Sequence, residues 1–335
     1  MLEGVVNLMG GRRRVNVLEI VVIAVTLAMI VAFSFVIDGF ATPGNFKVIL
    51  SNSVSLVILS CGMGVVVISR GLDLSLIAVM VAGATIFSVQ IDAGMPASLA
   101  LLVTIGAMVL VGLINAWLIA YVEIPAMLAT LASAMLVAGL CRFAILRGEF
   151  LVLLPQSNPA VMFFASDIVP GISVPVALML ATLFACWFLL HYSAAGRTLY
   201  AMGDNFQAAR LSGLPVRTTT ITIYIFAAFA ALLAGLVTSS ASGAVDFRTV
   251  TNGGLLFEVI LAVVLGGIPL RGGRGGVRNI LLGVALIAVM RNGMTLMNFT
   301  TQTQDVFKGL VLLLAVVTDN YLNPRDTETD TVGDL

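Results

Sequence analysis

The sequence predicts an all-α integral membrane protein with about ten transmembrane helices and both termini in the cytoplasm. Hydrophobic residues make up 60% of the 335 residues, charged residues only 10%, and the mean hydropathy is +1.10. Soluble proteins carry about 25% charged residues. Apolar runs also follow one another along most of the chain, and the basic residues gather in alternate loops between them. These observations leave no room for a sizeable soluble domain.

The first apolar run, residues 17–37, follows three arginines and is predicted to be a retained membrane helix. A secretory signal has an apolar region of about 7–15 residues that ends at a small-residue cleavage site. This run is longer, and no such site is evident before Asp38. We therefore expect residues 1–16 to form a short cytoplasmic segment before a transmembrane domain that covers residues 17–321.

Nine further apolar runs are predicted to cross the membrane, because a span needs roughly 20 apolar residues. They are residues 53–69, 76–91, 97–121, 125–146, 174–193, 219–239, 257–270, 280–297 and 306–321. Several are short or interrupted by glycine, and irregular backbone is tolerated at membrane depth only where protein buries it or it lines a cavity. A break after a valine-rich run recurs at 65–75 and 263–275, which suggests two five-helix halves and a substrate pathway.

The basic residues set the predicted orientation, because Lys and Arg concentrate on the cytoplasmic side. A cytoplasmic N-terminus places most of the 17 basic residues in the cytoplasm, namely Arg12, Arg13, Arg14, Arg70, Arg197, Arg210, Arg217, Arg271, Arg274, Arg278 and Arg325. An even number of spans returns residues 322–335, an acidic tail, to the same side. The net charge of zero gives no support for nucleic-acid binding, and the arginines suit lipid headgroups.

One polar helical stretch, residues 196–214, interrupts the apolar runs on the predicted cytoplasmic side. Asp204 or Asn205 can cap a helix of about two turns, and Gly213 can adopt the left-handed conformation after its end. Pro215 prevents the helix from continuing. The local sequence thus predicts a short, well-delimited helix.

This helix is predicted to contact another protein. Gln207 and Arg210 offer polar contacts, while Ala208 and Ala209 would leave the backbone open to close approach. An ordinary solvated loop helix has the same composition and is the alternative interpretation.

The chain is predicted to do no bond chemistry and to bind no cofactor. Cys61, Cys141 and Cys186 lie in apolar runs without paired spacing, and His191 is the only histidine, so a disulfide or metal site is not expected. The only two lysines lie outside any Gly-x-x-x-x-Gly-Lys-Ser/Thr pattern, so the chain lacks a phosphate-binding P-loop. If ATP drives this protein, another chain hydrolyses it.

Four sequence blocks occur in the order found in one transporter family. They are Gly71–Ser75 (GLDLS); Gly112–Asn115 with Ile124, Pro125, Thr130 and Leu131; Gly196 and Arg197 with Asn205, Ala208, Ala209, Ser212 and Gly213; and Leu265–Gly267 with Gly272–Gly275, followed by Asn292 and Gly293. Over residues 17–319 the chain resembles the permease subunit of monosaccharide ABC importers, the family that includes the ribose and xylose permeases. Within these blocks, the Gly-x-Asp-Leu-Ser pattern at residues 71–75 favours a sugar over a branched-chain amino acid as the transported solute.

The resemblance implies a bacterial inner-membrane complex that works by alternating access. Its partners would be a second permease copy or paralogue, ABC ATPase subunits that bind ATP and Mg, and a periplasmic solute-binding protein. The loop of about residues 196–218 would contact the ATPase. Its implicated residues are Gly196, Arg197, Asp204, Asn205, Ala208, Ala209, Ser212 and Gly213.

The chain departs from the family pattern at three places. Ile77 and Ala78 stand where Gly-Ser is common, Arg278 and Asn279 replace residues that are usually apolar or small, and Thr295 often has Asn in its place. These differences leave the ATPase-facing loop unaffected.

Several polar residues lie in or beside the apolar runs and are candidates for a translocation pathway. They are Asp73, Ser75, Asn115, Thr130, Ser133, Asn292 and Thr295. Each hydroxyl or amide could instead make a helix–helix hydrogen bond. For Asp73 we favour a structural role, as the cap of the third span with Ser75 as a second candidate and Arg70 as a possible ion-pair partner. Glu258 and Arg291 need partners and form either an ion pair or part of a polar pathway.

Three other functions remain open from the sequence. A branched-chain amino-acid ABC permease would share the fold and the ATP coupling. A secondary transporter or channel working alone would use ion-coupled flux and no ATPase. A membrane enzyme is disfavoured, because His, Cys and carboxylates do not cluster at ligand or nucleophile spacing.

Overall fold

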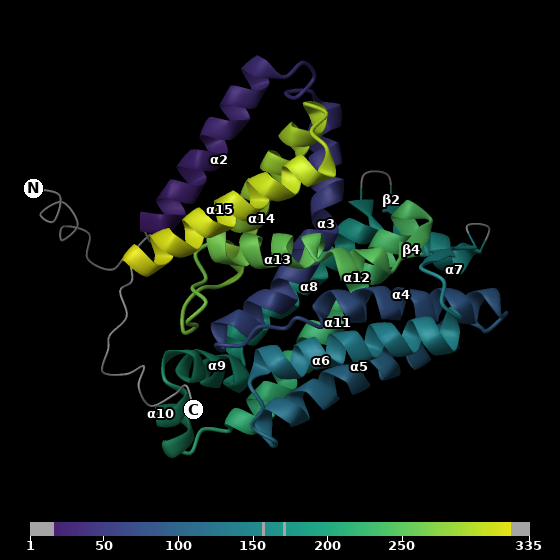
Figure 1. Cartoon of the computed structure of the whole chain (residues 1–335), viewed down its shortest axis with the longest axis vertical. Helices are drawn as coiled ribbons and strands as arrows, with labels where there is room; N and C mark the ends of the chain where they lie inside the picture. The colour runs from purple at the N-terminus through teal and green to yellow at the C-terminus, as the bar shows by residue number, and fades with distance from the viewer. Residues whose placement is uncertain (1–16, 156–157, 170–171, 323–335) are drawn as a thin grey trace, which may run out of the picture.

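The computed structural model describes residues 17–155, 158–169 and 172–322, and most of them are helical (Figure 1). The long helices are α2 (Val17–Val36), α3 (Pro43–Ile68), α4 (Leu76–Asp92), α5 (Ala97–Ala120), α6 (Ala126–Leu140), α8 (Val174–Tyr192), α11 (Val216–Ser242), α13 (Gly254–Leu265), α14 (Val277–Leu296) and α15 (Thr301–Leu322). Each of the ten predicted runs overlaps one of these helices. The sequence-based boundary was least accurate for α3, which begins ten residues earlier than expected.

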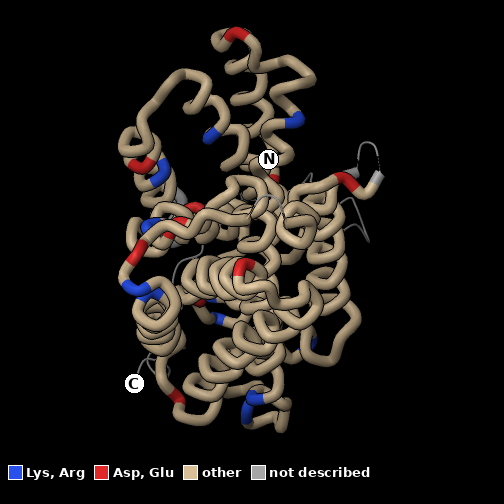
Figure 2. The backbone as a smooth tube through the Cα atoms, turned by 90° about the vertical axis from the view of Figure 1, so that its right-hand side faces the viewer, with Lys and Arg blue, Asp and Glu red and all other residues tan. Residues whose placement is uncertain are grey.

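Seven of the described helices are long and apolar enough to cross a membrane, namely α2, α3, α5, α6 with its continuation, α8, α11 and α14. The continuation of α6 is a π-helical turn, Cys141–Ile145. α4 and α13 are apolar but shorter, with 17 and 12 residues. At about 1.5 Å per residue, α13 spans only about 18 Å of a hydrocarbon core about 30 Å thick. Figure 2 shows long stretches of helix without a charged residue between scattered charged positions.

The centre of the molecule is formed by α3, α4 and α11. In the most apolar part of α3, 83% of the residues are buried, against 6% in α2. Small residues allow the close packing: a Cβ on Gly235 of α11 would lie 2.2 Å from the carbonyl oxygen of Met80 in α4. Apolar side chains on the outer helices are exposed, as expected for surfaces that face lipid tails.

α2 packs along α14 and is held at both ends. At one end the Phe33 ring occupies the space where a Cβ on Gly293 would lie. At the other, Glu19 forms an ion pair with Arg278 at 3.3 Å and accepts a hydrogen bond from Asn279 Nδ2 at 3.2 Å. Two residues that depart from the family pattern, Arg278 and Asn279, therefore attach the first helix to the rest of the chain.

Two small antiparallel ribbons are an addition to the predicted all-helical fold. β1 (Leu151–Leu153) pairs with β4 (Ala244–Asp246), and β2 (Asp167–Val169) pairs with β3 (Ile172–Ser173). They lie with the short helices α7 (Pro159–Met162) and α12 (Arg248–Asn252) at one end of the long helices. α9 (Ala194–Asp204) and α10 (Phe206–Leu211) lie at the other end (Figure 1).

Candidate functional site

The polar stretch folds into two short helices, α9 and α10. The Ser193 hydroxyl caps α9 by accepting a hydrogen bond from the Gly196 N–H at 2.9 Å. Asn205 caps α10 by accepting from the Ala208 N–H at 2.9 Å, and Gly213 has φ +75° after its end. The predicted short helix is confirmed with Asn205 as its cap. Asp204 is not that cap, because it is the last residue of α9, a helix that the sequence did not separate from α10.

The two alanines of α10 face opposite environments. Ala209 is only 4% exposed and packs on Met202 and Val216 of the same chain, so the expectation that it lies open to a neighbouring protein is wrong. Ala208 is exposed, as are Phe206 and Leu211, the latter at 87%. The outer surface of α10 is therefore apolar as well as polar.

The remaining loop residues divide between internal and surface positions. Gly196 is buried, and a Cβ there would lie 2.2 Å from the Leu189 carbonyl oxygen, so glycine is required by the close turn from α8 into α9. Arg197, Ser212 and Gly213 are exposed. Arg210 forms a surface ion pair with Glu123 at 3.1 Å, which ties α10 to the segment between α5 and α6.

α9 meets two other segments in a contact made almost entirely by backbone. A Cβ on Gly203 would lie 2.0 Å from the carbonyl oxygen of Ile68, at the end of α3, and 2.3 Å from the backbone nitrogen of Gly273. Gly273 donates its N–H to that Ile68 carbonyl at 2.8 Å, and the Tyr200 hydroxyl donates to the Gly275 carbonyl at 2.7 Å. We call these five residues the backbone junction. It joins the third and fourth sequence blocks to the end of α3.

The first two sequence blocks meet at the break between α3 and α4, in a group that we call the Asp73 cluster: Asp73, Ser75, Asn115, Thr130 and Tyr224. Asp73 Oδ1 accepts hydrogen bonds from the Ser75 N–H at 2.9 Å and from the Ser75 hydroxyl. Ser75 Oγ in turn accepts from Asn115 Nδ2 at 2.9 Å. Asp73 thus braces the turn before α4, but the prediction that it caps this helix is wrong. Ser75 is the N-cap residue, and no side chain makes a capping hydrogen bond to α4, because the Ser75 hydroxyl donates to Asp73 instead.

Thr130 of α6 holds the backbone of the same break. Its hydroxyl accepts from the Leu74 N–H at 3.1 Å and can donate to the Leu72 carbonyl at 3.1 Å or to the Ala126 carbonyl at 2.8 Å. Thr130 is completely buried. Four of the seven predicted pathway residues are therefore buried in the interior and hydrogen-bonded at the break between α3 and α4. They are Asp73, Ser75, Asn115 and Thr130.

The other three predicted pathway residues lie elsewhere. Asn292 exchanges hydrogen bonds with Asn45 at 2.9 and 3.0 Å, which links α14 to α3 as a helix–helix contact. The Thr295 hydroxyl is exposed and donates to the Arg291 carbonyl of its own helix at 2.8 Å. Ser133 is buried in α6. Tyr224 was missed, because a single tyrosine in an apolar run resembles a packing residue.

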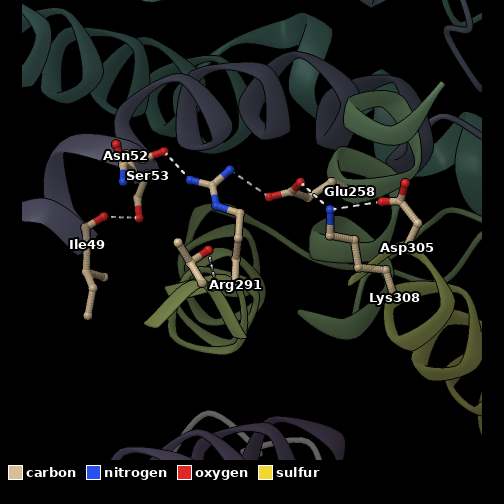
Figure 3. Close-up of polar contacts among 8 residues, drawn as sticks. Ile49, Asn52, Ser53, Glu258, Arg291, Asp305 and Lys308 are labelled. Atoms are coloured by element: carbon tan, nitrogen blue, oxygen red, sulfur yellow. Dashed lines mark hydrogen bonds and ion pairs between the residues drawn. The ribbon is translucent and has the colours of Figure 1, made fainter. Parts of the chain in front are cut away.

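A second polar group, which we call the Glu258 network, links four helices (Figure 3). Glu258 of α13 is bonded through Oε1 to Arg291 of α14 at 2.9 Å and through Oε2 to Lys308 of α15 at 3.3 Å. Arg291 also donates to the Asn52 carbonyl of α3 at 2.8 Å, and Lys308 pairs with Asp305 at 3.4 Å. Glu258 and Arg291 thus form the ion pair that was one of the two interpretations from the sequence. No salt bridge joins Arg70 to Asp73 among the described residues.

Known proteins with similar sequences are transport permeases. A family model described as "Branched-chain amino acid transport system / permease component" matches residues 45–316. The ribose import permease protein RbsC of Escherichia coli K12 is 29% identical over 88% of this chain and 91% of its own length. The L-arabinose transport system permease protein AraH of the same strain is 33% identical over 89% of each chain. XylH, its xylose counterpart, is 27% identical over 94% of this chain and 95% of its own. No solved structure matches significantly.

Proposed function

Because this chain belongs to the family of branched-chain amino acid transport system permease components, we propose that it is the transmembrane permease subunit of an ABC importer for a monosaccharide or related polyol. The observation that carries the substrate class is the likeness, over about nine-tenths of both chains, to permeases named for ribose and L-arabinose. Those names favour a sugar over the amino acid in the family description.

The surface of α9 and α10 is proposed to dock an ATPase subunit that binds ATP and Mg. A side chain caps the N-terminus of each helix, Ser193 for α9 and Asn205 for α10. The two short helices are therefore well formed and can move together as one surface. Leu211 and Phe206 expose apolar area on the same short helix as the exposed polar side chain of Gln207. An apolar centre with a polar rim is typical of protein–protein interfaces. The backbone junction connects this surface to α3, which supports a role in coupling.

We further propose ten membrane spans with the α9–α10 end in the cytoplasm and the chain in the bacterial inner membrane. The distribution of arginines supports this orientation. The opposite end, with the β ribbons and α7, would then face a periplasmic solute-binding protein, and a second permease copy or paralogue would complete the pathway. The predicted cytoplasmic segment 1–16 and the predicted tail, apart from Leu322, lie outside the described residues.

The proposal is tested by purifying the chain in mild detergent from its source cells and identifying co-purified proteins by mass spectrometry. We expect an ATPase and a solute-binding protein. The complex is then placed in proteoliposomes, and uptake of labelled ribose, arabinose, xylose and leucine is measured with and without ATP. Leucine uptake alone would establish the amino-acid function. Flux driven by an ion gradient without any ATPase would establish a secondary transporter.

The docking surface is tested separately with Leu211→Asp, which places a charge on the exposed apolar part of α10. We expect it to lose ATP-driven uptake and ATPase co-purification while the chain still inserts and folds. Leu153→Asp is the matched control for ATPase co-purification, because Leu153 is a similarly exposed leucine, 75% exposed, on β1 at the opposite end, away from the proposed ATPase surface. Equal retention of the ATPase by both variants would refute docking at α10.

A further inference from the structure

The Asp73 cluster contains buried polar atoms that have no hydrogen-bond partner. Both hydrogen bonds to Asp73 come from Ser75 and end on the same carboxylate oxygen, Oδ1. Asn115 uses its amide nitrogen on Ser75, and its Oδ1 is buried without a hydrogen-bond partner. The Tyr224 hydroxyl is likewise buried and without a partner. Unpaired buried oxygens of this kind are rare in native proteins and are usually satisfied by water or an ion.

The unpartnered groups converge on one segment of backbone. A Cβ on Gly71 would lie 3.1 Å from the Tyr224 hydroxyl oxygen, which places that oxygen against the segment that carries Asp73. On the neighbouring helix, a Cβ on Gly112 would lie 2.8 Å from the Tyr224 carbonyl oxygen, so the turn of α5 that carries Asn115 packs directly on this part of α11.

The cluster also contains a buried carboxyl group that has no basic partner. Asp73 is 2% exposed, and no basic side chain forms a salt bridge with it in the part of the chain that the structure describes. A buried carboxylate is costly unless a cation or several hydrogen bonds compensate it. The two hydrogen bonds from Ser75 satisfy one oxygen only. An ionised Asp73 would need a cation at this site to compensate its charge.

We propose that the Asp73 cluster binds a monovalent cation such as Na⁺. The carboxylate, the Asn115 carbonyl and the tyrosine hydroxyl are hard oxygen ligands, which suit cations of this kind. A single carboxylate matches a single positive charge, whereas sites for divalent cations usually gather more carboxylates. The bound cation would fix the break between α3 and α4 to α5 and α11. This inference is independent of the transported solute and of the ATPase.

The test measures the thermal unfolding midpoint of the purified chain in detergent, with NaCl, KCl or choline chloride at equal ionic strength. A cation that binds only the folded state stabilises it by mass action. We expect Na⁺ or K⁺ to raise Tm over choline by about 2–4 °C, with a saturable dependence on concentration. Equal Tm values in the three salts would overturn the proposal.

Three variants locate the response. Asp73→Asn removes the charge with little change in shape, and Tyr224→Phe removes only a hydroxyl that has no partner; we expect both to lose the difference between salts. Asp305→Asn is the control, because it neutralises a half-exposed carboxylate in the Glu258 network, and it should keep the difference. A difference that persists in both Asp73→Asn and Tyr224→Phe would show that the cation binds elsewhere and would overturn this site. Since nothing is transported in the assay, failure of the proposed function cannot produce either result.

Discussion

The two buried carboxylates, Asp73 and Glu258, are stabilised in opposite ways. Glu258 has a basic side chain on each carboxylate oxygen, from two different helices. Asp73 has only the N–H and hydroxyl of Ser75, two residues away. The first arrangement joins helices through charge. The second braces a local turn and leaves the carboxyl group without a basic partner in the part of the chain that the structure describes. Burial therefore does not by itself reveal whether an acidic residue connects distant segments.

The largest expected effect is that of Glu258→Gln. Removing the carboxylate leaves Arg291 and Lys308 close together without their shared counter-charge. Breaking a buried ion pair by removing one partner costs about 3–5 kcal/mol, and we expect about 3 kcal/mol here because Arg291 keeps partial access to solvent. The unfolding free energy of the purified chain measures this loss. Asp305→Asn serves as the reference, and a loss no larger than that of the reference would contradict the central place of Glu258.

An intermediate effect is expected for Thr130→Val. The substitution keeps the shape but removes the acceptor of the Leu74 N–H, and a buried donor left unpaired costs about 1–3 kcal/mol. Thr104→Val in α5 is the matched control, because the Thr104 hydroxyl is also fully buried but only donates to the Ala100 carbonyl of its own helix. Similar stability of the two variants would show that Thr130 does not hold the break.

The smallest expected effect is that of Asp73→Asn measured in choline chloride. Asparagine keeps the oxygen that accepts from Ser75, and its amide can donate toward the unpartnered Asn115 Oδ1. Because no basic partner is lost, we expect the unfolding free energy to change by less than about 1 kcal/mol. A destabilisation as large as that of Glu258→Gln would mean that the two carboxylates are compensated alike.

Much of the helical framework was predictable, because apolar runs, caps and prolines act locally. Asn205 and Gly213 delimit α10 as their chemistry requires. The direction in which that helix faces was not predictable. Ala208 and Ala209 are adjacent in sequence but about 100° apart around a helix, so only packing against Met202 and Val216 decides which one is buried.

Features that depend on contacts between distant segments could not be predicted either, because only the folded structure decides which segments meet. β1 and β4 are three-residue strands about 90 residues apart, and each becomes a strand only through its partner. Lys308 lies within the predicted span 306–321, but its pairing with Glu258 depends on how α13 and α15 are placed. The partnerless hydroxyl of Tyr224 likewise follows from what surrounds it in space, which the sequence of α11 does not encode by itself.

The backbone junction has a consequence for how motion can spread through the molecule. Side chains between two helices can change rotamer and absorb part of a displacement, whereas the contact of Gly203 with Ile68 and Gly273 has no side chain to rearrange. A shift of α9 towards this contact must therefore displace the backbone of Ile68 at the end of α3, or that of Gly273, which is hydrogen-bonded to Ile68. Five residues after Ile68 the chain reaches Asp73. The glycines thus make this end of the molecule stiff, although glycine is usually the residue that loosens a chain.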